Sequence, residues 1–307
     1  MDITVILCTY NRYESLAKAL ASLAVLRLPE SFEWEVLVVD NNSTDQTREV
    51  VEAFCRRYPG RFRYLFETQQ GKSYALNAGI RHARGNVLAF TDDDVTVEPS
   101  WLHNLTASLG KDQWVGAGGR TLPDCTFSPP RWLGLDTPRA LAPLAVFDLG
   151  SEACELSEPP FGNNMAYLRE VFSKYGDFRT ELGPRPGSEI RSEDTEFGQR
   201  LLSRGERLRY EPCAVVYHSI PANRMQKDYF LAWWFDKARA DILEFGIPTD
   251  TKWFFVGIPL YLFRRLVVWT LRWVSSGSPS RRFFSKRQVW WLAGTIVECF
   301  HQSHAHR

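Results

Sequence analysis

The sequence predicts an α/β fold in which a Rossmann-like mixed sheet is flanked by helices. Continuous apolar, β-rich runs alternate with helical runs as far as Thr91, and polar side chains follow the ends of these runs. Uninterrupted apolar strands are typical of parallel sheets that are buried on both faces. The alternation therefore predicts a mostly parallel sheet built with right-handed crossovers. The expected strands are Ile3–Cys8, Trp34–Val39, Phe62–Phe66 and Val87–Thr91.

Three helices are expected between these strands. Leucines at helical spacing predict a helix over Glu14–Leu26. The run STDQ, which begins at Ser43, fits a capping box and predicts a helix that continues to about Tyr58. A third helix is expected over Ser73–Ala83, with Gly85 ending it.

The regular alternation ends near Arg120. Residues 123–160 are rich in Pro and Leu, which predicts loops and short strands. A strand-to-helix signal then covers Phe161–Tyr175, and a helix is expected over residues 193–203 and a strand over 208–217.

Charge is distributed unevenly along the 307 residues. The formal net charge of +1 indicates no general attraction to nucleic acid. Residues 252–297 nevertheless contain eight Lys and Arg residues and no Asp or Glu. The six cysteines form no CxxC pair and have no zinc spacing, which favours a reducing compartment. The start of the chain predicts a strand rather than a signal peptide, so a cytosolic location is expected.

The run FTDDDV carries the strongest chemical signal. It places Asp92, Asp93 and Asp94 directly after a buried strand, where their mutual repulsion costs free energy unless a cation neutralises it. Carboxylate oxygens suit Mg²⁺ or Mn²⁺, and ligands of open α/β sheets bind at the carboxyl ends of strands. The alternative is a solvated acidic turn, and the position of the run favours the cation site.

Other polar segments are expected at the same edge of the sheet. Thr9–Arg12 and Asp40–Asn42 follow the first two strands, and QGKSYALNAG, from Gln69, offers a lysine and a helix N-terminus that favour phosphate. This segment lacks the glycine spacing of a P-loop. No GxGxxG follows the first strand, so a dinucleotide site is excluded.

Together, five motifs resemble the family 2 glycosyltransferases, which have the GT-A fold. The motifs are ILCTYNR, VVDNNSTDQT, QGKSYALNAG, FTDDDV and RSEDTEF, in the order that the family has, and the resemblance covers roughly residues 2–220. It implies a nucleotide-diphospho-sugar donor, a divalent cation (Mn²⁺ or Mg²⁺) and inverting transfer. With it we expect a GT-A catalytic domain over residues 1–222, with a nucleotide-binding half (1–120) and an acceptor half (121–222).

The resemblance also assigns roles to single residues. Asp40 matches the position that binds the nucleotide base, and Asp194 matches the catalytic base. Asp92 and Asp94 match the pair of metal-site aspartates, the first also facing the ribose, and Asp93 between them supports the loop on the donor side. The other donor-side positions implied are Thr9, Tyr10, Arg12 and Lys72.

Four assignments keep their alternatives. His218, at a strand end, is a metal-ligand candidate or a half-buried structural histidine. Asn163 and Asn164 match a segment beneath the donor sugar, or they form a turn. Arg224 is a candidate contact for a donor or acceptor phosphate. Glu193-Asp194 also fits the acidic first turn of a helix, which the helix dipole favours.

An amphipathic helical extension is predicted for residues 223–307. Seven of the eleven tryptophans lie between Trp233 and Trp291, and paired arginines at Arg264 and Arg265 interrupt an apolar run too short to span a bilayer. Trp and Phe beside Arg are typical of helices that lie in a membrane interface, so residues 252–297 predict a peripheral contact with the cytoplasmic face of the cell membrane. The alternative is packing on the catalytic domain or on a second subunit, which leaves a homodimer open.

The resulting hypothesis is an enzyme that moves one sugar to a hydroxyl of a cell-surface glycan or lipid-linked acceptor, with a UDP-sugar favoured as donor. The processive QxxRW motif is missing: Ser128 stands where the Gln before Arg131-Trp132 belongs. A polyprenyl-phosphate sugar synthase, a nucleotidyltransferase and a non-catalytic glycan- or lipid-binding module are the alternatives.

Overall fold

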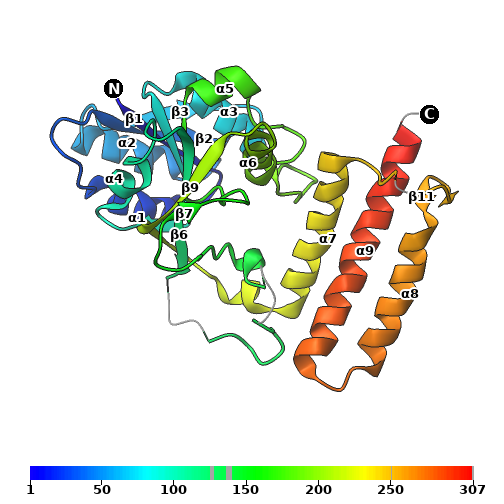
Figure 1. Cartoon of the computed structure of the whole chain (residues 1–307). Helices are drawn as coiled ribbons and strands as arrows, with labels where there is room; N and C mark the ends of the chain where they lie inside the picture. The colour runs from blue at the N-terminus through cyan, green and yellow to red at the C-terminus, as the bar shows by residue number, and fades with distance from the viewer. Residues whose placement is uncertain (125–127, 136–139, 250, 306–307) are drawn as a thin grey trace. The chain divides into compact units, whose positions relative to one another are not determined.

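The structure, a computed structural model, describes residues 1–124, 128–135, 140–249 and 251–305. It divides into two compact units (Figure 1). The first unit contains Met1–Asp124, Ala145–Gly187 and Glu193–Ser219, and the second contains Cys125–Leu144, Ser188–Ser192 and Ile220–Arg307. Two internal segments thus group with the C-terminal helices, although they precede the end of the sheet in chain order.

Nine strands of the described residues form one mixed sheet in the first unit, as the predicted fold class requires. The strands are β1 (Ile3–Thr9), β2 (Trp34–Asp40), β3 (Phe62–Phe66), β4 (Val87–Asp92), β5 (Val95–Val97), β6 (Trp114–Pro123), β7 (Cys154–Glu155), β8 (Met165–Leu168) and β9 (Arg207–His218). Their order is β3-β2-β1-β4-β8-β6-β9-β5, with β7 paired to β9. Strands β3, β2, β1 and β4 are parallel, whereas β8 pairs antiparallel with both β4 and β6.

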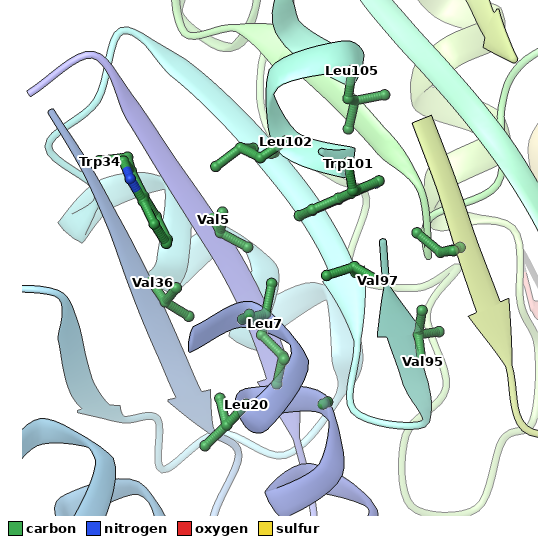
Figure 2. Packing of buried hydrophobic residues seen from close by; sticks show 14 of the residues in the cluster. Val5, Leu7, Leu20, Trp34, Val36, Val95, Val97, Trp101, Leu102 and Leu105 are labelled. Carbon is green, nitrogen blue, oxygen red and sulfur yellow. The ribbon is translucent and has the colours of Figure 1, made fainter. Parts of the chain in front are cut away.

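Helices cover both faces of this sheet. They are α1 (Tyr13–Ala24), α2 (Thr47–Arg57), α3 (Lys72–His82), α4 (Trp101–Thr106), α5 (Glu170–Tyr175) and α6 (Glu193–Ser203). Side chains of β1 alternate between two cores because successive residues of a strand point to opposite faces. Val5 and Leu7 pack with α1, α2 and α4, as Figure 2 shows for part of that core, and Ile6 packs with α3, α5 and α6.

The predicted elements of the first half all form, with their ends shifted by a few residues. The capping box was wrong: α2 begins at Thr47, and Asp45 accepts its backbone N–H at 3.0 Å. The hydroxyl of Ser43 instead accepts the backbone N–H of Asn11 at 2.9 Å. Asn11 has a left-handed backbone (φ 51°), which Asn tolerates better than most residues. The segment expected to begin the helix therefore joins the loops after β1 and β2.

The second unit contains three long helices, and the expected C-terminal helical extension is present. Its elements are η1 (Ala142–Leu144), η2 (Ala222–Met225), α7 (Lys227–Phe245), β10 (Phe254–Phe255), β11 (Ile258–Pro259), α8 (Leu260–Ser275) and α9 (Pro279–Ala305). Helix α9 packs on both α7 and α8, and the β10–β11 hairpin precedes α8 (Figure 1). Among the described residues, no helix combines the length and the apolarity that crossing a membrane requires.

Candidate active site

The carboxyl ends of four strands bring the predicted site residues to one edge of the sheet. In register, Thr9 of β1 lies beside Asp40 of β2, and Cys8 lies beside Asp92 of β4. Strand β9 is parallel to β6, and its last residue, His218, pairs with Val95, directly after the acidic run. Parallel strands end on the same side of a sheet, so motifs far apart in the chain converge there.

The acidic run is held by the first loop. Thr9 donates its hydroxyl to Asp93 Oδ2 at 2.8 Å, and Arg12 Nη1 lies 3.1 Å from Asp93 Oδ1 and 3.2 Å from Asp94 Oδ2. Burial raises the pKa of Asp93 to about 6, although Arg12 opposes that rise. The same pairing with Asp93 raises the pKa of Arg12. Asp93 thus ties the first loop to the end of β4. The donor-side roles expected for Thr9, Arg12 and Asp93 stay predictions.

Asp94 and His218 form the part of the site that suits a metal ion. Asp94 Oδ1 lies 3.5 Å from His218 Nε2, and both side chains are largely buried. A carboxylate and an imidazole fit Mn²⁺ or Mg²⁺, which take few protein ligands and complete their shell with substrate phosphates and water. Asp92 instead contacts Lys72. Within the described residues, no group of three or more His, Cys, Asp or Glu side chains is arranged to hold a metal.

Asp40 is buried and bound through both of its oxygens. Its Oδ1 accepts the backbone N–H of Ser43 at 2.9 Å, and its Oδ2 accepts the hydroxyl of Tyr64 at 2.8 Å. Tyr64, on β3, was missed by the sequence reasoning because its place next to Asp40 depends on strand pairing. Tyr10 is exposed on the first loop. The role of Asp40 in binding a base stays a prediction.

Lys72 connects the donor side of the site with α6. Its Nζ lies 3.0 Å from Asp92 Oδ1 and 3.4 Å from Glu193 Oε1. Burial by itself lowers the pKa of Lys72, but Asp92, Glu193 and Asp194 outweigh it and raise this pKa well above its usual value. Lys72 is thus a firmly charged lysine that ties Asp92 to Glu193 at the start of α6.

The N-terminus of α3 offers less to a phosphate than its sequence suggested. The backbone N–H of Gly71 donates to Asn41 Oδ1 at 2.7 Å, and that of Lys72 donates to the carbonyl of Pro184 at 2.8 Å. These two amides are therefore already used within the protein. The Lys72 side chain, rather than these amides, is the group that remains for an anion.

Glu193 is a second residue that sequence reasoning left without a role. It is buried beside Asp194, and its Oε2 has no hydrogen-bond partner among the described residues. Burial raises the pKa of Glu193 to about 7, and Lys72 counteracts part of that rise. The signal in the sequence was only its adjacency to Asp194, which does not reveal its burial.

Replacing this glutamate should change how stability depends on pH. The folded-state pKa of about 7 exceeds the ordinary value of 4.5, so folding retains a proton that the unfolded chain releases. Stability from Glu193 is complete below pH 4.5 and is lost as the pH rises to about 7. Glu193→Gln removes that loss, so the free energy of unfolding should shift relative to the wild type by up to about 3 kcal/mol across this window.

Urea unfolding at a series of pH values, without divalent cations, measures this shift. Glu170→Gln is the matched control, because Glu170 is exposed on α5 and should leave the pH profile unchanged. Parallel profiles for the wild type and Glu193→Gln would contradict a raised pKa for Glu193.

Asp194 lies at the start of α6 and is held by two backbone amides. Gly162 donates its N–H to Asp194 Oδ2 at 2.5 Å, and Thr195 donates its own to Oδ1 at 2.7 Å. A Cβ at Gly162 would lie 2.9 Å from Asp194 Oδ2, so only glycine permits this approach. The segment before β8 thus orients the carboxylate that the resemblance implies is the catalytic base.

Asn163 and Asn164 have different surroundings. Asn163 Oδ1 accepts the hydroxyl of Thr121 at 3.2 Å, and its Nδ2 has no acceptor among the described residues. Asn164 is 1% exposed; it accepts the indole N–H of Trp101 at 2.8 Å and donates to the carbonyls of Arg120 and Ala214. These partners use both amide hydrogens of Asn164, which favours a structural role, and its expected sugar contact stays a prediction.

Arg224 belongs to the second unit, where its guanidinium lies 5.9 Å from the ring centre of Tyr229. Its expected contact with a phosphate stays a prediction.

Comparison with known protein families decides the identity of the first unit. The family model described as "Glycosyl transferase family 2" matches residues 4–176, just over half of the chain. The chain belongs to glycosyl transferase family 2. The enzyme class and the family expected from the five motifs are confirmed.

Two named proteins are similar to this chain along most of its length. The succinoglycan biosynthesis protein ExoM of Rhizobium meliloti is 29% identical over 76% of this chain and 70% of its own length. The glucosyl-dolichyl phosphate glucuronosyltransferase of Haloferax volcanii is 27% identical over 79% of this chain and 78% of its own length.

Solved structures of two other proteins share the fold. The mannosyltransferase PcManGT from Pyrobaculum calidifontis, in complex with GDP-Man and Mn²⁺, superposes with a TM-score of 0.67 at 20% identity, over 98% of this chain and 87% of that one. S. aureus TarS 1-349 in complex with UDP has a TM-score of 0.54 at 15% identity, over 100% and 93% of the two chains. The GT-A fold is thereby confirmed.

Proposed function

We propose that this family 2 glycosyltransferase is a metal-dependent, inverting enzyme that transfers one sugar from a nucleotide-diphospho-sugar, with UDP the favoured nucleotide. The acceptor is a hydroxyl of a cell-surface glycan or of a lipid-linked saccharide. The contacts of Lys72 carry the proposal, because this residue joins Asp92 on the donor side to Glu193, the neighbour of the base candidate. The donor and the acceptor hydroxyl therefore meet at one strand edge.

The site residues support a single displacement. Asp194, oriented by the amides of Gly162 and Thr195, takes the proton of the acceptor hydroxyl as its oxygen bonds to the anomeric carbon. The bond from that carbon to the phosphate oxygen breaks on the opposite side, and the nucleoside diphosphate departs. The ammonium group of Lys72 is available to balance negative charge on the departing nucleoside diphosphate. A divalent cation held by Asp94 and His218 would neutralise further charge on the leaving group.

Nucleotide binding tests the donor and metal parts of the proposal. Calorimetry of UDP, GDP and dTDP with Mn²⁺ or Mg²⁺ should reveal one nucleotide whose binding requires the cation. Asp94→Asn keeps the shape of the side chain but weakens a metal ligand, so it should lower that affinity at least about tenfold. The control is Asp112→Asn, which makes the same change at an exposed position in the turn before β6. Equal affinity with and without cation would overturn the metal-dependent proposal.

The relatives support a lipid-linked acceptor, since the name of one includes glucosyl-dolichyl phosphate. A polyprenyl-phosphate sugar synthase is the alternative within the same fold. There the acceptor is a phosphate oxygen, which needs no base. The amide-held carboxylate of Asp194 favours the hydroxyl acceptor.

We also propose that the second unit contacts the cytoplasmic face of the cell membrane. Its helix α8 exposes Val267, Val268, Leu271 and Val274, which lie on one side of a helix with a period of 3.6 residues. The hairpin before α8 adds exposed aromatic side chains, with Trp253 74% exposed. Basic residues and no acidic ones accompany these side chains between residues 252 and 297. This combination suits an anionic lipid surface.

A triple substitution at exposed positions tests the membrane contact without disturbing the core. Val267→Ser, Leu271→Ser and Val274→Ser together should weaken sedimentation with anionic vesicles at least about tenfold, since each removes apolar area that enters lipid. Val25→Ser with Leu149→Ser is the control, because these residues are equally exposed in the first unit. The contrary result is a stable homodimer of the wild type that the triple variant does not form. That result would show that a second copy of the chain, rather than a membrane, covers the exposed apolar residues of α8.

A further inference from the structure

The second unit contains a cavity that the proposed sugar transfer does not use. Its volume is about 410 Å³, within the range of small-molecule sites. The end of α8, the start of α9 and part of α7 line it, together with Leu133, Gly134 and Ala140. All of these segments belong to the second unit.

One part of the cavity wall is cationic and rich in hydroxyls. Arg272, Arg281 and Arg287 line it, with the hydroxyl side chains of Ser275, Ser276, Ser280 and Ser285. None of the described lining residues is acidic, and residues 252–297 contain no Asp or Glu at all. Three guanidinium groups that share one cavity repel each other, so this wall is expected to gain from an anion with several oxygens.

Arg287 shows that this charge is not simply solvated. Its guanidinium stacks 4.5 Å from the ring centre of Trp234 and 4.6 Å from that of Phe284. Its Nε has no hydrogen-bond partner among the described residues, and burial lowers the pKa of Arg287 to about 10. A buried N–H group of this kind costs free energy until an acceptor reaches it.

Other residues that line the cavity are apolar. Phe230 and Phe283 are almost completely buried and contact Trp132 edge-to-face, with ring centres 5.2 and 4.4 Å away. Leu133 and Ala140 are further apolar residues that line the cavity. An apolar chain attached to a phosphate would contact these lining residues, which a free phosphate or pyrophosphate would not.

We propose that this cavity binds the phosphate or pyrophosphate headgroup of a long-chain lipid, with the arginines and serines on the headgroup and the aromatic wall on the first part of the chain. The inference rests on the proposed function, because such a lipid would be the carrier of the acceptor saccharide. Lipid binding itself requires neither sugar transfer nor the residues at the sheet edge. Its failure can therefore be distinguished from failure of the proposed reaction.

Binding of three probes to the full-length chain tests the proposal. Farnesyl diphosphate carries chain and headgroup, inorganic pyrophosphate carries only the headgroup, and farnesol carries only the chain. Calorimetry is done in EDTA, which removes the divalent cation that binding at the nucleotide site is proposed to require. Farnesyl diphosphate should bind at least tenfold more tightly than either of the others. Equal binding of pyrophosphate would overturn the lipid assignment, and equal binding of farnesol would overturn the headgroup site.

Paired charge substitutions locate the site. Arg272→Gln with Arg281→Gln removes two exposed guanidinium groups from the cavity wall, and it should weaken farnesyl diphosphate binding at least tenfold. Arg265→Gln with Arg282→Gln makes the same charge change on the same two helices, at exposed positions that do not line the cavity. This control and Asp94→Asn should bind within about twofold of the wild type. Equal losses in both arginine pairs would show nonspecific attraction and overturn the proposal.

Discussion

Asp194→Asn is expected to lower the rate of sugar transfer by about 10²–10⁴-fold, the range attributed to a positioned general base. The asparagine retains an oxygen that can accept the N–H of Gly162, so the segment before β8 should keep its place. Only the ability to take a proton from the acceptor hydroxyl is lost. Initial rates with saturating donor, together with calorimetric nucleotide affinity, separate this loss from a loss of binding.

The outcome also distinguishes the two acceptor classes. Nucleotide affinity should remain within about twofold, since the backbone hydrogen bonds of Asp194 run to Gly162 and Thr195. Asp177→Asn, an exposed carboxylate ahead of α6 in the chain, should have normal rates and serves as the control. A variant that retains a large part of its activity would contradict the hydroxyl acceptor, and it would favour a phosphate acceptor that needs no base.

Asn164→Leu is expected to lower the free energy of unfolding by about 3 kcal/mol or more. The leucine has a similar volume, but it leaves the indole N–H of Trp101 and the carbonyls of Arg120 and Ala214 without their partner. Each of these buried polar groups then costs about 1–3 kcal/mol. Urea unfolding of the two proteins at one pH measures the difference.

A neighbouring asparagine provides the matched control. Asn104, on α4, donates to the carbonyl of Cys213 at 2.8 Å at a site that water can reach. Asn104→Leu should therefore cost less than about 1 kcal/mol, because water replaces the lost hydrogen bond. Wild-type stability of Asn164→Leu combined with a loss of sugar transfer would restore the sugar-binding role that the sequence suggested for Asn164.

Much of the sheet was predictable because its first half follows local rules. Apolar runs such as Trp34–Val39 mark strands that are buried on both faces, and each is followed by a helix of matching periodicity. The capping box at Ser43 failed because a side chain that could cap a helix found a partner in another loop, the backbone of Asn11. Such a competition between local and distant hydrogen bonds leaves no trace in the local sequence.

The candidate site was predictable to the extent that it consists of motifs. The acidic run, Asp40 and Asp194 each carry a recognisable neighbourhood in the sequence. The partners of these residues were not predictable in the same way: Tyr64 reaches Asp40 through the register of β2 and β3, and Lys72 reaches Glu193 across more than a hundred residues. Burial also depends on the whole fold, so the raised pKa of Glu193 has no counterpart in the residue pattern.

The sequence by itself determined the α/β class, the family and the residue types at the edge of the sheet, because periodicity and motif order are properties of short segments. The tertiary structure alone decided that Asn164 is a core residue, that Lys72 lies between two carboxylates and that three arginines share one cavity. These features require segments distant in the chain to meet. Their meeting depends on strand pairing and helix packing, which the free energy of the whole fold selects.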